Sequence, residues 1–407
     1  MLRLLLFTIS TYIMGGQMIE WIYLLSFILV IFILKAHPTS MIFVFLVNFL
    51  NGFTSFITTF VTYELVSFER ELVFFLLLTF NVSIFIFHLG YQFIKKDDAV
   101  YISFAKYKHS RLILLFLFIP TLFVTIQNIT QGIDVITYGY IAGYKNVSEQ
   151  TIKATSFFPF LLIFYFLVSV FYLREKKIIY LLVMMFIVIS YLVYGGRSFF
   201  LYSFMSIISF SILLKKITYK KCIIVSSLLL PIVVAVGAFR EGGVGGDSTL
   251  LYRMAMELAN IPMIISNLNV LDNLNQSIPS VVLTTLPQSI IVPLGMIPVN
   301  SLATEFAMNY DPGWAEAGGG FGFTIIGEIY YRFGYVGLIV IPYSLVMFLH
   351  YLEKKFLNGD DFDKALILTM YYGLLMWVRG DFIEISRLML IVLFFYYSKR
   401  LVYRNGK

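Results

Sequence analysis

Apolar runs recur from one end of this chain to the other, and they constrain its fold more than any other feature. A helix needs roughly 20 mostly apolar residues to cross the hydrocarbon core of a bilayer. Runs that approach or meet this length follow one another, separated by polar turns. We predict membrane-spanning helices near residues 2–16, 19–34, 40–62, 72–94, 112–130, 156–173, 178–194, 198–214, 222–239, 323–350, 365–378 and 388–400.

The scarcity of charge excludes a soluble globular protein. Only 13% of the 407 residues are charged, whereas soluble domains carry about 25%. So few charges cannot cover a water-facing surface. We therefore predict an all-α polytopic membrane protein in which residues 1–407 form one transmembrane domain of about twelve helices. The first apolar run is short and lacks a small-residue cleavage site, so we expect an uncleaved helix, and eleven spans if it does not cross.

The positions of the basic residues predict the orientation of these helices. With the N-terminus and every second turn placed in the cytoplasm, 21 of the 30 Lys and Arg residues lie inside and nine lie outside. This agrees with the positive-inside rule at every turn. Both termini are then cytoplasmic. The basic residues serve orientation here, so the net charge of +7 does not indicate a nucleic-acid partner.

The residues expected outside differ in kind from those expected inside. Seven of the nine external basic residues are Arg, whereas 16 of the 21 internal ones are Lys, and 16 of the 23 acidic residues lie outside or near that face. Arginine holds phosphate or carboxylate through two parallel hydrogen bonds. The external set therefore predicts an anion-binding face, unless these acids and arginines pair only with one another.

Two external loops carry most of these residues. The loop 131–155 is polar and rich in Tyr. The loop 240–322 is far longer and combines an amphipathic helical stretch with a proline-broken apolar segment, which we predict to be re-entrant or interfacial. It ends in a Gly-rich stretch with Glu305, Asp311, Trp314 and Glu316. Aromatic and acidic residues in such a stretch suit carbohydrate contact, and they equally suit an interfacial lid.

Several external residues are candidates for a site, and each has a structural alternative. Arg197 follows two glycines that permit close approach of a ligand, although it could simply stop a span. Glu328 and Arg332 lie four apart on a helix and could form only an intrahelical ion pair. The last outer turn carries four charged residues that could form a salt-bridge network alone: Arg379, Asp381, Glu384 and Arg387.

Some kinds of chemistry have no motif in the chain. We find no nucleotide-binding loop, and a single cysteine, Cys222, provides neither a disulfide framework nor a Cys-rich metal site. The predicted topology places His37, His109 and His350 inside and His88 late in an inward span, which excludes an external His base or zinc site. We expect no cofactor and no metal, so the chemistry would depend on external carboxylates and arginines.

Three stretches resemble the bacterial O-antigen polymerases of the Wzy type. They are YGGRSFFLYSF at 194–204, AFREGG at 238–243 and GGGFGFTIIGEIYYRFGYVGLIV at 318–340. The order of spans, the long outer loop before the third-last span and the basic cytoplasmic turns are also similar. The resemblance implies an architecture like the GT-C-like O-antigen polymerases and ligases. It also implies an enzyme of the bacterial inner membrane with a periplasmic active face.

The resemblance implies a lipid-linked glycosyltransferase that moves a growing glycan from undecaprenyl pyrophosphate to the non-reducing end of a new lipid-linked repeat unit. Its expected partners are this substrate, membrane lipids, and the chain-length regulator and flippase of the same pathway. On this basis we assign pyrophosphate binding to Arg197, Arg240 and Arg253, with Arg332 and Arg379 as second choices. The base would be Glu241, Asp381 or Glu328.

Two other functions are compatible with this architecture. An O-antigen ligase is similar in its spans, but ligases of that family typically carry a His in the large outer loop, and the loop 240–322 has none. A flippase or secondary transporter of the same lipid-linked glycan usually shows two similar halves and charged residues along its path. We see no internal repeat, and the charge is concentrated at one face.

Overall fold

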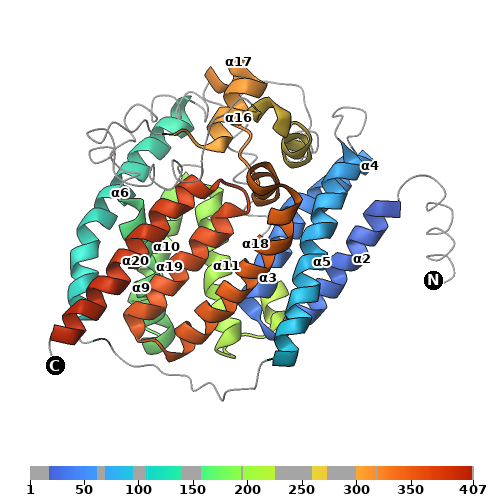
Figure 1. Cartoon of the computed structure of the whole chain (residues 1–407). Coiled ribbons are helices and arrows are strands. Elements are labelled where there is room, and N and C mark those ends of the chain that lie inside the picture. The colour runs from blue at the N-terminus through green and yellow to red at the C-terminus, as the bar shows by residue number, and fades with distance from the viewer. Residues whose placement is uncertain are drawn as a thin grey trace.

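The computed structural model describes residues 18–61, 69–94, 107, 109–138, 157–193, 196–224, 259–272, 299–316 and 320–405. Within these ranges the chain forms helices and no strand. Figure 1 shows most of the helices side by side in a bundle, with two short helices across one end. We call the end that carries these two short helices the upper end of the bundle, and the opposite end the lower end.

Helices of the bundle that are joined by short turns run in opposite directions between its upper and lower ends. Their bounds are α2 Met18–Ile33, η1 Leu34–Ala36, α3 Pro38–Val47, η2 Asn48–Phe53, α4 Thr54–Val61, α5 Arg70–Ile94, α6 Ser110–Tyr138, α9 Phe158–Glu175, α10 Ile178–Val193, α11 Arg197–Leu213, α18 Ile325–Asn358, α19 Asp361–Trp377 and α20 Phe382–Asn405. At the upper end lie η3 Leu268–Leu271, α16 Leu302–Tyr310 and α17 Pro312–Glu316.

The apolar runs of the sequence correspond to these helices. Within the described ranges six helical segments are long and apolar enough to cross a membrane: Met18–Ala36, Pro38–Phe56, Arg70–Gly90, Ser110–Val135, Phe158–Glu175 and Ile325–Asn358. The shorter apolar helices α10 and α11 pack among them. These segments confirm an all-α membrane protein.

Some predicted elements differ in extent or lie outside the described residues. The helix α6 continues to Tyr138, so the first part of the loop 131–155 is helical. The predicted span 2–16 and most of the span 222–239 are outside the described ranges, as is the proline-broken apolar segment of the long loop except its last residues. Within that loop, residues 259–266, η3, α16 and α17 are helical.

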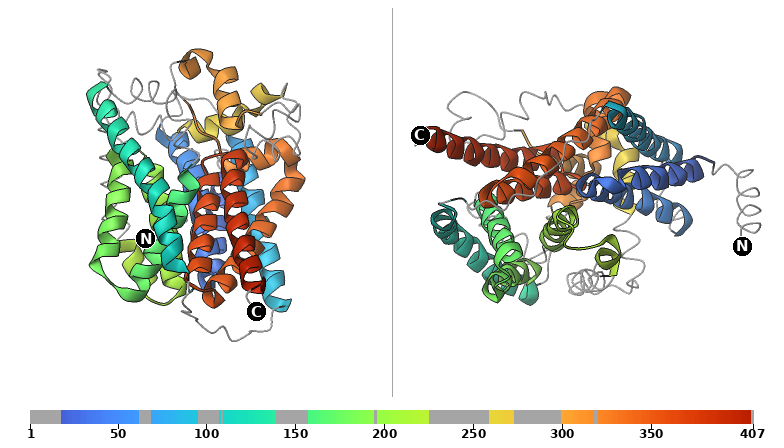
Figure 2. Two further views of the ribbon diagram at one scale, coloured as in Figure 1. Left: turned by 90° about the vertical axis from the view of Figure 1, so that its left-hand side faces the viewer. Right: turned by 90° about the horizontal axis from the view of Figure 1, so that it is seen from below.

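The outer surface of the bundle is apolar, as a lipid-facing surface must be. Side chains such as Phe32 on α2, Ile119 on α6 and Leu182 on α10 are 73%, 71% and 56% exposed. Monomeric soluble proteins rarely leave continuous apolar surfaces of this kind in water. Seen from below in Figure 2, α6, α9 and α10 group at one side, α2 and α5 at the other, and α18 and α19 lie between them. The chain is therefore a multi-pass membrane protein.

Basic turns meet at the lower end. Arg174 forms an ion pair with Asp361 and joins the α9–α10 turn to the start of α19. Lys216 donates to the carbonyl oxygen of Leu173 at 2.6 Å, and the Tyr219 hydroxyl donates to the carbonyl oxygen of Lys35 at 2.7 Å. Four turns that the charge pattern assigned to one side of the membrane thus lie together.

Three histidines also gather toward the lower end, away from α16 and α17. The rings of His37 and His350 stack with centroids 3.7 Å apart, and the ring of His88 packs edge-on against both. Nδ1 of His37 lies 3.0 Å from a carboxylate oxygen of Glu353, and the other oxygen accepts from the backbone and hydroxyl of Thr39. These histidines therefore take no part in an arrangement at the upper end.

The helix α18 has a break near its upper end. Gly334 has φ 59° and ψ −153°, which is not helical, so the residues before it form a separate short segment. Thr324 caps this segment by accepting hydrogen bonds from the backbone N–H groups of Ile326 and Gly327. The Thr324 hydroxyl in turn donates to Asn51, which lies in the π-helical segment η2. The start of α18 is therefore fixed to the middle of the α3–α4 span.

A close approach between α2 and η2 gives a first prediction. A Cβ atom added to Gly52 would lie 1.6 Å from the Tyr23 hydroxyl oxygen, and overpacking of a close-packed interior costs about 1–3 kcal/mol. We expect Gly52→Ala to lower the thermal unfolding midpoint of the purified protein. Gly90→Ala is the matched control because, apart from the adjoining backbone of its own helix, no atom of the described residues lies within 4 Å of its added Cβ. Equal midpoints for the two variants would contradict this account of the contact.

Candidate functional site

Charged residues from α18 and from the α19–α20 turn converge at the upper end of the bundle. Glu328, in the first turn of α18, is 1% exposed. One of its carboxylate oxygens accepts from Nε of Arg332 at 2.7 Å. The other accepts from Nε1 of Trp377 and from the backbone N–H of Phe382, each at 2.8 Å. Three donors from two separate parts of the chain thus hold this carboxylate in place.

The ion pair with Glu328 positions Arg332 but does not occupy all of its donor atoms. Its side chain is 7% exposed, and its Nε atom donates to Glu328. Among the described residues, no acceptor lies within hydrogen-bonding reach of its buried Nη2 atom. A buried guanidinium N–H without an acceptor is costly. The geometry therefore leaves one charged donor available for an anion.

Asp381 provides a second buried carboxylate beside the first. The residue is 1% exposed, and its charge is close enough to interact with that of Glu328. One oxygen, Oδ2, accepts from the backbone N–H of Ala303 in the first turn of α16 at 3.3 Å. The other, Oδ1, is buried and has no hydrogen-bonding partner in the described part of the chain. Within the described residues, Asp381 thus accepts fewer hydrogen bonds than Glu328.

Arg379 lies at the edge of this cluster and is exposed. Its backbone and side chain pass over Gly322, whose added Cβ would lie 3.6 Å from the Arg379 carbonyl oxygen and 3.9 Å from Nε. Gly322 has a positive φ of 74°, a conformation that side chains rarely adopt. Gly322 therefore packs directly against the side chain of Arg379, which remains exposed.

The other predicted site residues lie on a neighbouring helix or outside the described residues. Arg197 is the first residue of α11 and follows Gly196, at the upper end of a helix that packs against α19. Its side chain is half-buried. Glu241, Arg240 and Arg253 lie outside the described residues. The structure thus groups Glu328, Arg332, Arg379 and Asp381, with Arg197 on a neighbouring helix at the same end.

Sequence reasoning missed the groups that organise these charges. The backbone N–H groups of Phe382 and Ala303 carry no signal in the sequence, because any residue type supplies them. Trp377 ends the predicted span just before the last outer turn, and an indole N–H needs an acceptor when buried. That rule could have pointed to Trp377 as a partner of a nearby carboxylate.

The cluster has a definite chemical capacity. The buried carboxylates of Glu328 and Asp381 lie close to each other, Glu328 holds the buried guanidinium of Arg332, and Arg379 precedes Asp381 by two residues on the α19–α20 turn. Arginines can stabilise negative charge that develops on a leaving phosphate, and a carboxylate can take a proton from a hydroxyl group. This combination suits transfer of a group from a phosphate ester to an alcohol.

Comparison with known proteins identifies one matching family. No curated protein and no solved structure matches the chain. The sequence profile of one family, described as O-antigen polysaccharide polymerase Wzy, matches residues 1–405, which is nearly the whole length of the chain. The chain therefore belongs to the Wzy family of O-antigen polysaccharide polymerases.

Proposed function

We propose that this polymerase transfers the growing glycan from undecaprenyl pyrophosphate to the non-reducing end of a new undecaprenyl-pyrophosphate-linked repeat unit. The bond that breaks joins the anomeric carbon of the glycan to a pyrophosphate oxygen. The bond that forms joins this carbon to a hydroxyl oxygen of the acceptor, whose proton passes to a carboxylate. Undecaprenyl pyrophosphate leaves with the bonding electron pair.

The observation that carries this proposal is the convergence of Asp381 and Arg332 at one buried cluster, each with one polar atom that has no partner among the described residues. The leaving pyrophosphate gains negative charge in the transition state, and donors already in place stabilise it best there. We assign this role to Arg332 and Arg379 together with Arg197. Arg240 and Arg253 remain proposed members of the same set.

The two carboxylates have different proposed roles. Glu328 already accepts three hydrogen bonds, one of them from its ion-pair partner Arg332, so it positions Arg332 rather than reacting. Asp381 has an unoccupied oxygen and is the proposed base, and Glu241 remains a second candidate. Because Asp381 is 1% exposed, an acceptor hydroxyl reaches Oδ1 only when the packing around this side chain opens.

The proposed setting is the bacterial inner membrane, with the upper end of the bundle facing the periplasm. Twelve spans, cytoplasmic termini and a periplasmic upper end would place the cluster at the face where the lipid-linked glycan is presented. The chain-length regulator and the flippase of the pathway would act beside it. Membership of the polymerase family favours this function over the ligase and the flippase or transporter.

An arginine-to-lysine series tests pyrophosphate binding. Lysine keeps the charge but removes the planar fork, and a hydrogen bond to a charged group contributes about 1.5–3 kcal/mol. We expect Lys at Arg197, Arg240, Arg253, Arg332 or Arg379 to slow polymerisation about tenfold to a hundredfold at the positions that bind pyrophosphate. The measurement is the lipopolysaccharide ladder on a gel after complementation of a deletion strain.

Arg70→Lys is the matched control for this series. Arg70 also forms an ion pair with a buried glutamate, Glu20, at 2.6 Å, but it lies on α5 and is not one of the proposed pyrophosphate-binding residues. It should give a normal ladder. Core with a single repeat unit is expected from the deletion strain itself. Normal ladders from all five lysine variants would reject the pyrophosphate assignment.

A further inference from the structure

The two short helices at the upper end each expose one aromatic ring, Tyr310 on α16 and Trp314 on α17. The rings of Phe306 and Tyr310 stack with centroids 5.2 Å apart, and Phe321 packs edge-on against Tyr310 at 5.6 Å. Tyr310 nevertheless remains 39% exposed, as does Trp314 on α17. The backbone N–H of Trp314 donates to Asp311 at 2.9 Å, which fixes the turn between the helices. Aromatic faces held this way lose little entropy when a ligand binds.

The charge of this surface has one sign. Between residues 299 and 316 the chain carries Glu305, Asp311 and Glu316 and neither Lys nor Arg. A carboxylate oxygen of Glu305 accepts from the Asn300 side chain at 2.8 Å, which orients it. Oriented carboxylates beside exposed aromatic rings provide acceptors for hydroxyl groups and flat faces for the C–H side of a sugar ring. They repel anions.

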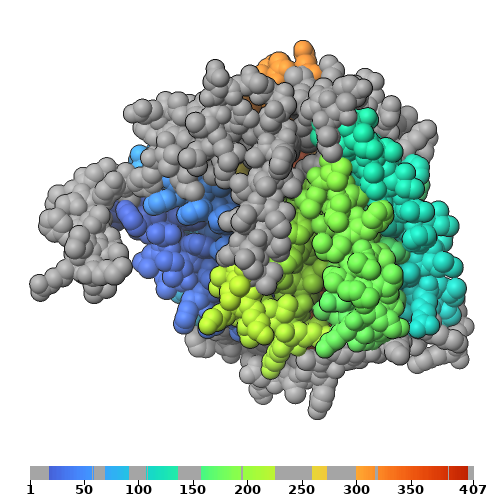
Figure 3. Space-filling model, turned by 180° about the vertical axis from the view of Figure 1, so that it is seen from behind, coloured from blue at the N-terminus to red at the C-terminus, as the bar shows by residue number. Residues whose placement is uncertain are grey.

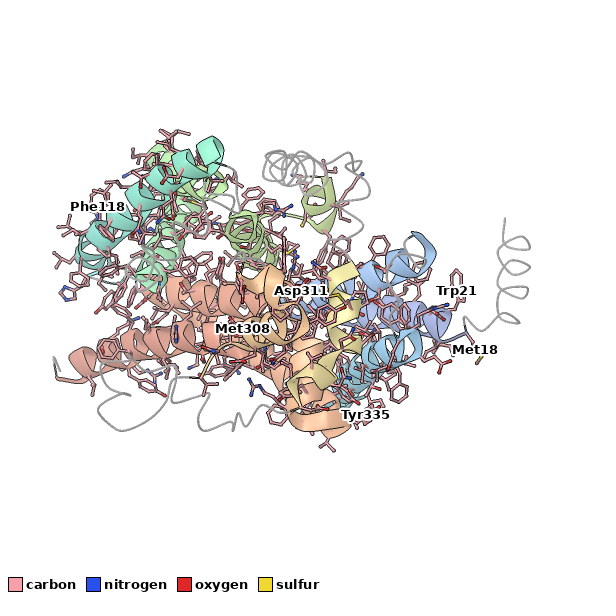
Figure 4. The ribbon with its side chains drawn as sticks, turned by 90° about the horizontal axis from the view of Figure 1, so that it is seen from above. Met18, Trp21, Phe118, Met308, Asp311 and Tyr335 are labelled. Carbon is pink, nitrogen blue, oxygen red and sulfur yellow. The ribbon has the colours of Figure 1, made fainter. Side chains whose placement is uncertain are left out.

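The surface is continuous with the candidate site. The first turn of α16 donates to Asp381 through the backbone of Ala303, and Leu302 and Phe306 are fully buried against Phe323 below. Viewed from above in Figure 4, Met308 and Asp311 lie over the middle of the bundle, whereas Met18, Trp21 and Phe118 lie at its rim. In Figure 3 the atoms of α17 form the uppermost part of the surface.

We propose that the surface formed by Glu305, Tyr310, Asp311, Trp314 and Glu316 binds the sugar chain of the substrate, and that it prefers uncharged or amino sugars to acidic ones. This inference rests on the proposed function and adds the glycan subsite to it. A membrane-interface role fits less well. The surface lies over the centre of the bundle, and its acidic residues repel anionic headgroups.

The test uses the full-length protein in nanodiscs and a probe without pyrophosphate. The probe is the polysaccharide released by mild acid from the lipopolysaccharide of the host strain. The chain has three tryptophans, Trp21, Trp314 and Trp377. We expect a saturable change in tryptophan emission with the wild type and with Trp21→Phe, and loss of this change with Trp314→Phe. Calorimetry should show about tenfold weaker binding for Trp314→Ala, as for an aromatic residue central to an interface.

Two further measurements separate the outcomes. Arg379→Lys should bind the released glycan normally, because the probe lacks the group that Arg379 is proposed to hold. Unchanged affinity in Trp314→Ala would overturn the glycan subsite and leave the polymerase proposal intact. Quenching of Trp314 emission by brominated lipids, without a response to glycan, would overturn it in favour of a membrane-interface surface. Failure of the proposed function is read separately, from the ladders of the arginine variants.

Discussion

Replacing Asp381 with Asn is expected to slow polymerisation about 100-fold or more, since general acid–base catalysis contributes about 10²–10⁴-fold. Asparagine keeps the size of the side chain and an oxygen that can accept from Ala303. It removes the negative charge and with it the ability to take up a proton. The measurement is the rate at which purified protein extends lipid-linked repeat units, resolved on a gel.

Asp272→Asn provides the control for this experiment. Asp272 is an exposed carboxylate just after η3, at the same end of the bundle. Its loss should leave the rate unchanged. If Asp381→Asn extended chains within about threefold of the wild-type rate, the proton would have to go to another group, and Glu241 would be the next residue to test.

Replacing Glu328 with Gln is expected to destabilise the protein by about 3–5 kcal/mol, the usual cost of leaving one partner of a buried ion pair uncompensated. Glutamine fills the same space and its carbonyl oxygen can still accept from Trp377 and Phe382, but its NH2 group replaces the oxygen that accepts from Arg332. Arg332 would then be a buried cation without its ion-pair partner. The thermal unfolding midpoint, followed by circular dichroism in detergent, measures the effect.

A second substitution distinguishes the effect of an uncompensated buried charge from the effect of altered side-chain packing. In the double variant Glu328→Gln with Arg332→Met, the uncompensated charge is gone and the long side chain is retained. We expect this variant to recover part of the lost stability and to remain inactive in polymerisation. A double variant less stable than Glu328→Gln would mean that Arg332 contributes mainly through contacts other than its pair with Glu328.

Hydropathy predicted the transmembrane helices where charge is absent and missed their ends where charge is buried. The span predicted at 156–173 corresponds closely to α9, Phe158–Glu175. The helix α19 instead begins at Asp361, before the predicted 365. Its first turn is charged, but Arg174 pairs with Asp361 and Lys399 pairs with Asp363. A hydropathy window treats such residues as solvent-exposed because their partners are far away in sequence.

The candidate site was predictable only where its members are close in sequence. The spacing of Glu328 and Arg332 predicted an ion pair, and the ion pair is present at 2.7 Å. The approach of Trp377 to Glu328 and of α16 to Asp381 depends on how the helices pack. No local pattern encodes these contacts. The same holds for Asn51, which reaches Thr324 from a π-helical segment that the apolar run 40–62 did not reveal.

The break at Gly334 bears on the depth at which the cluster lies in the bilayer. Residues 335–352 of α18, which end just before Glu353, Lys354 and Lys355, rise about 27 Å at 1.5 Å per residue, close to the roughly 30 Å of a hydrocarbon core. The segment before the break, which carries Glu328 and Arg332, is therefore not needed to cross the membrane. We infer that it lies at the level of the lipid headgroups, where the pyrophosphate of the proposed lipid-linked substrate would hold its charge. Such an enzyme can act on its carrier while the hydrocarbon tail stays in the bilayer.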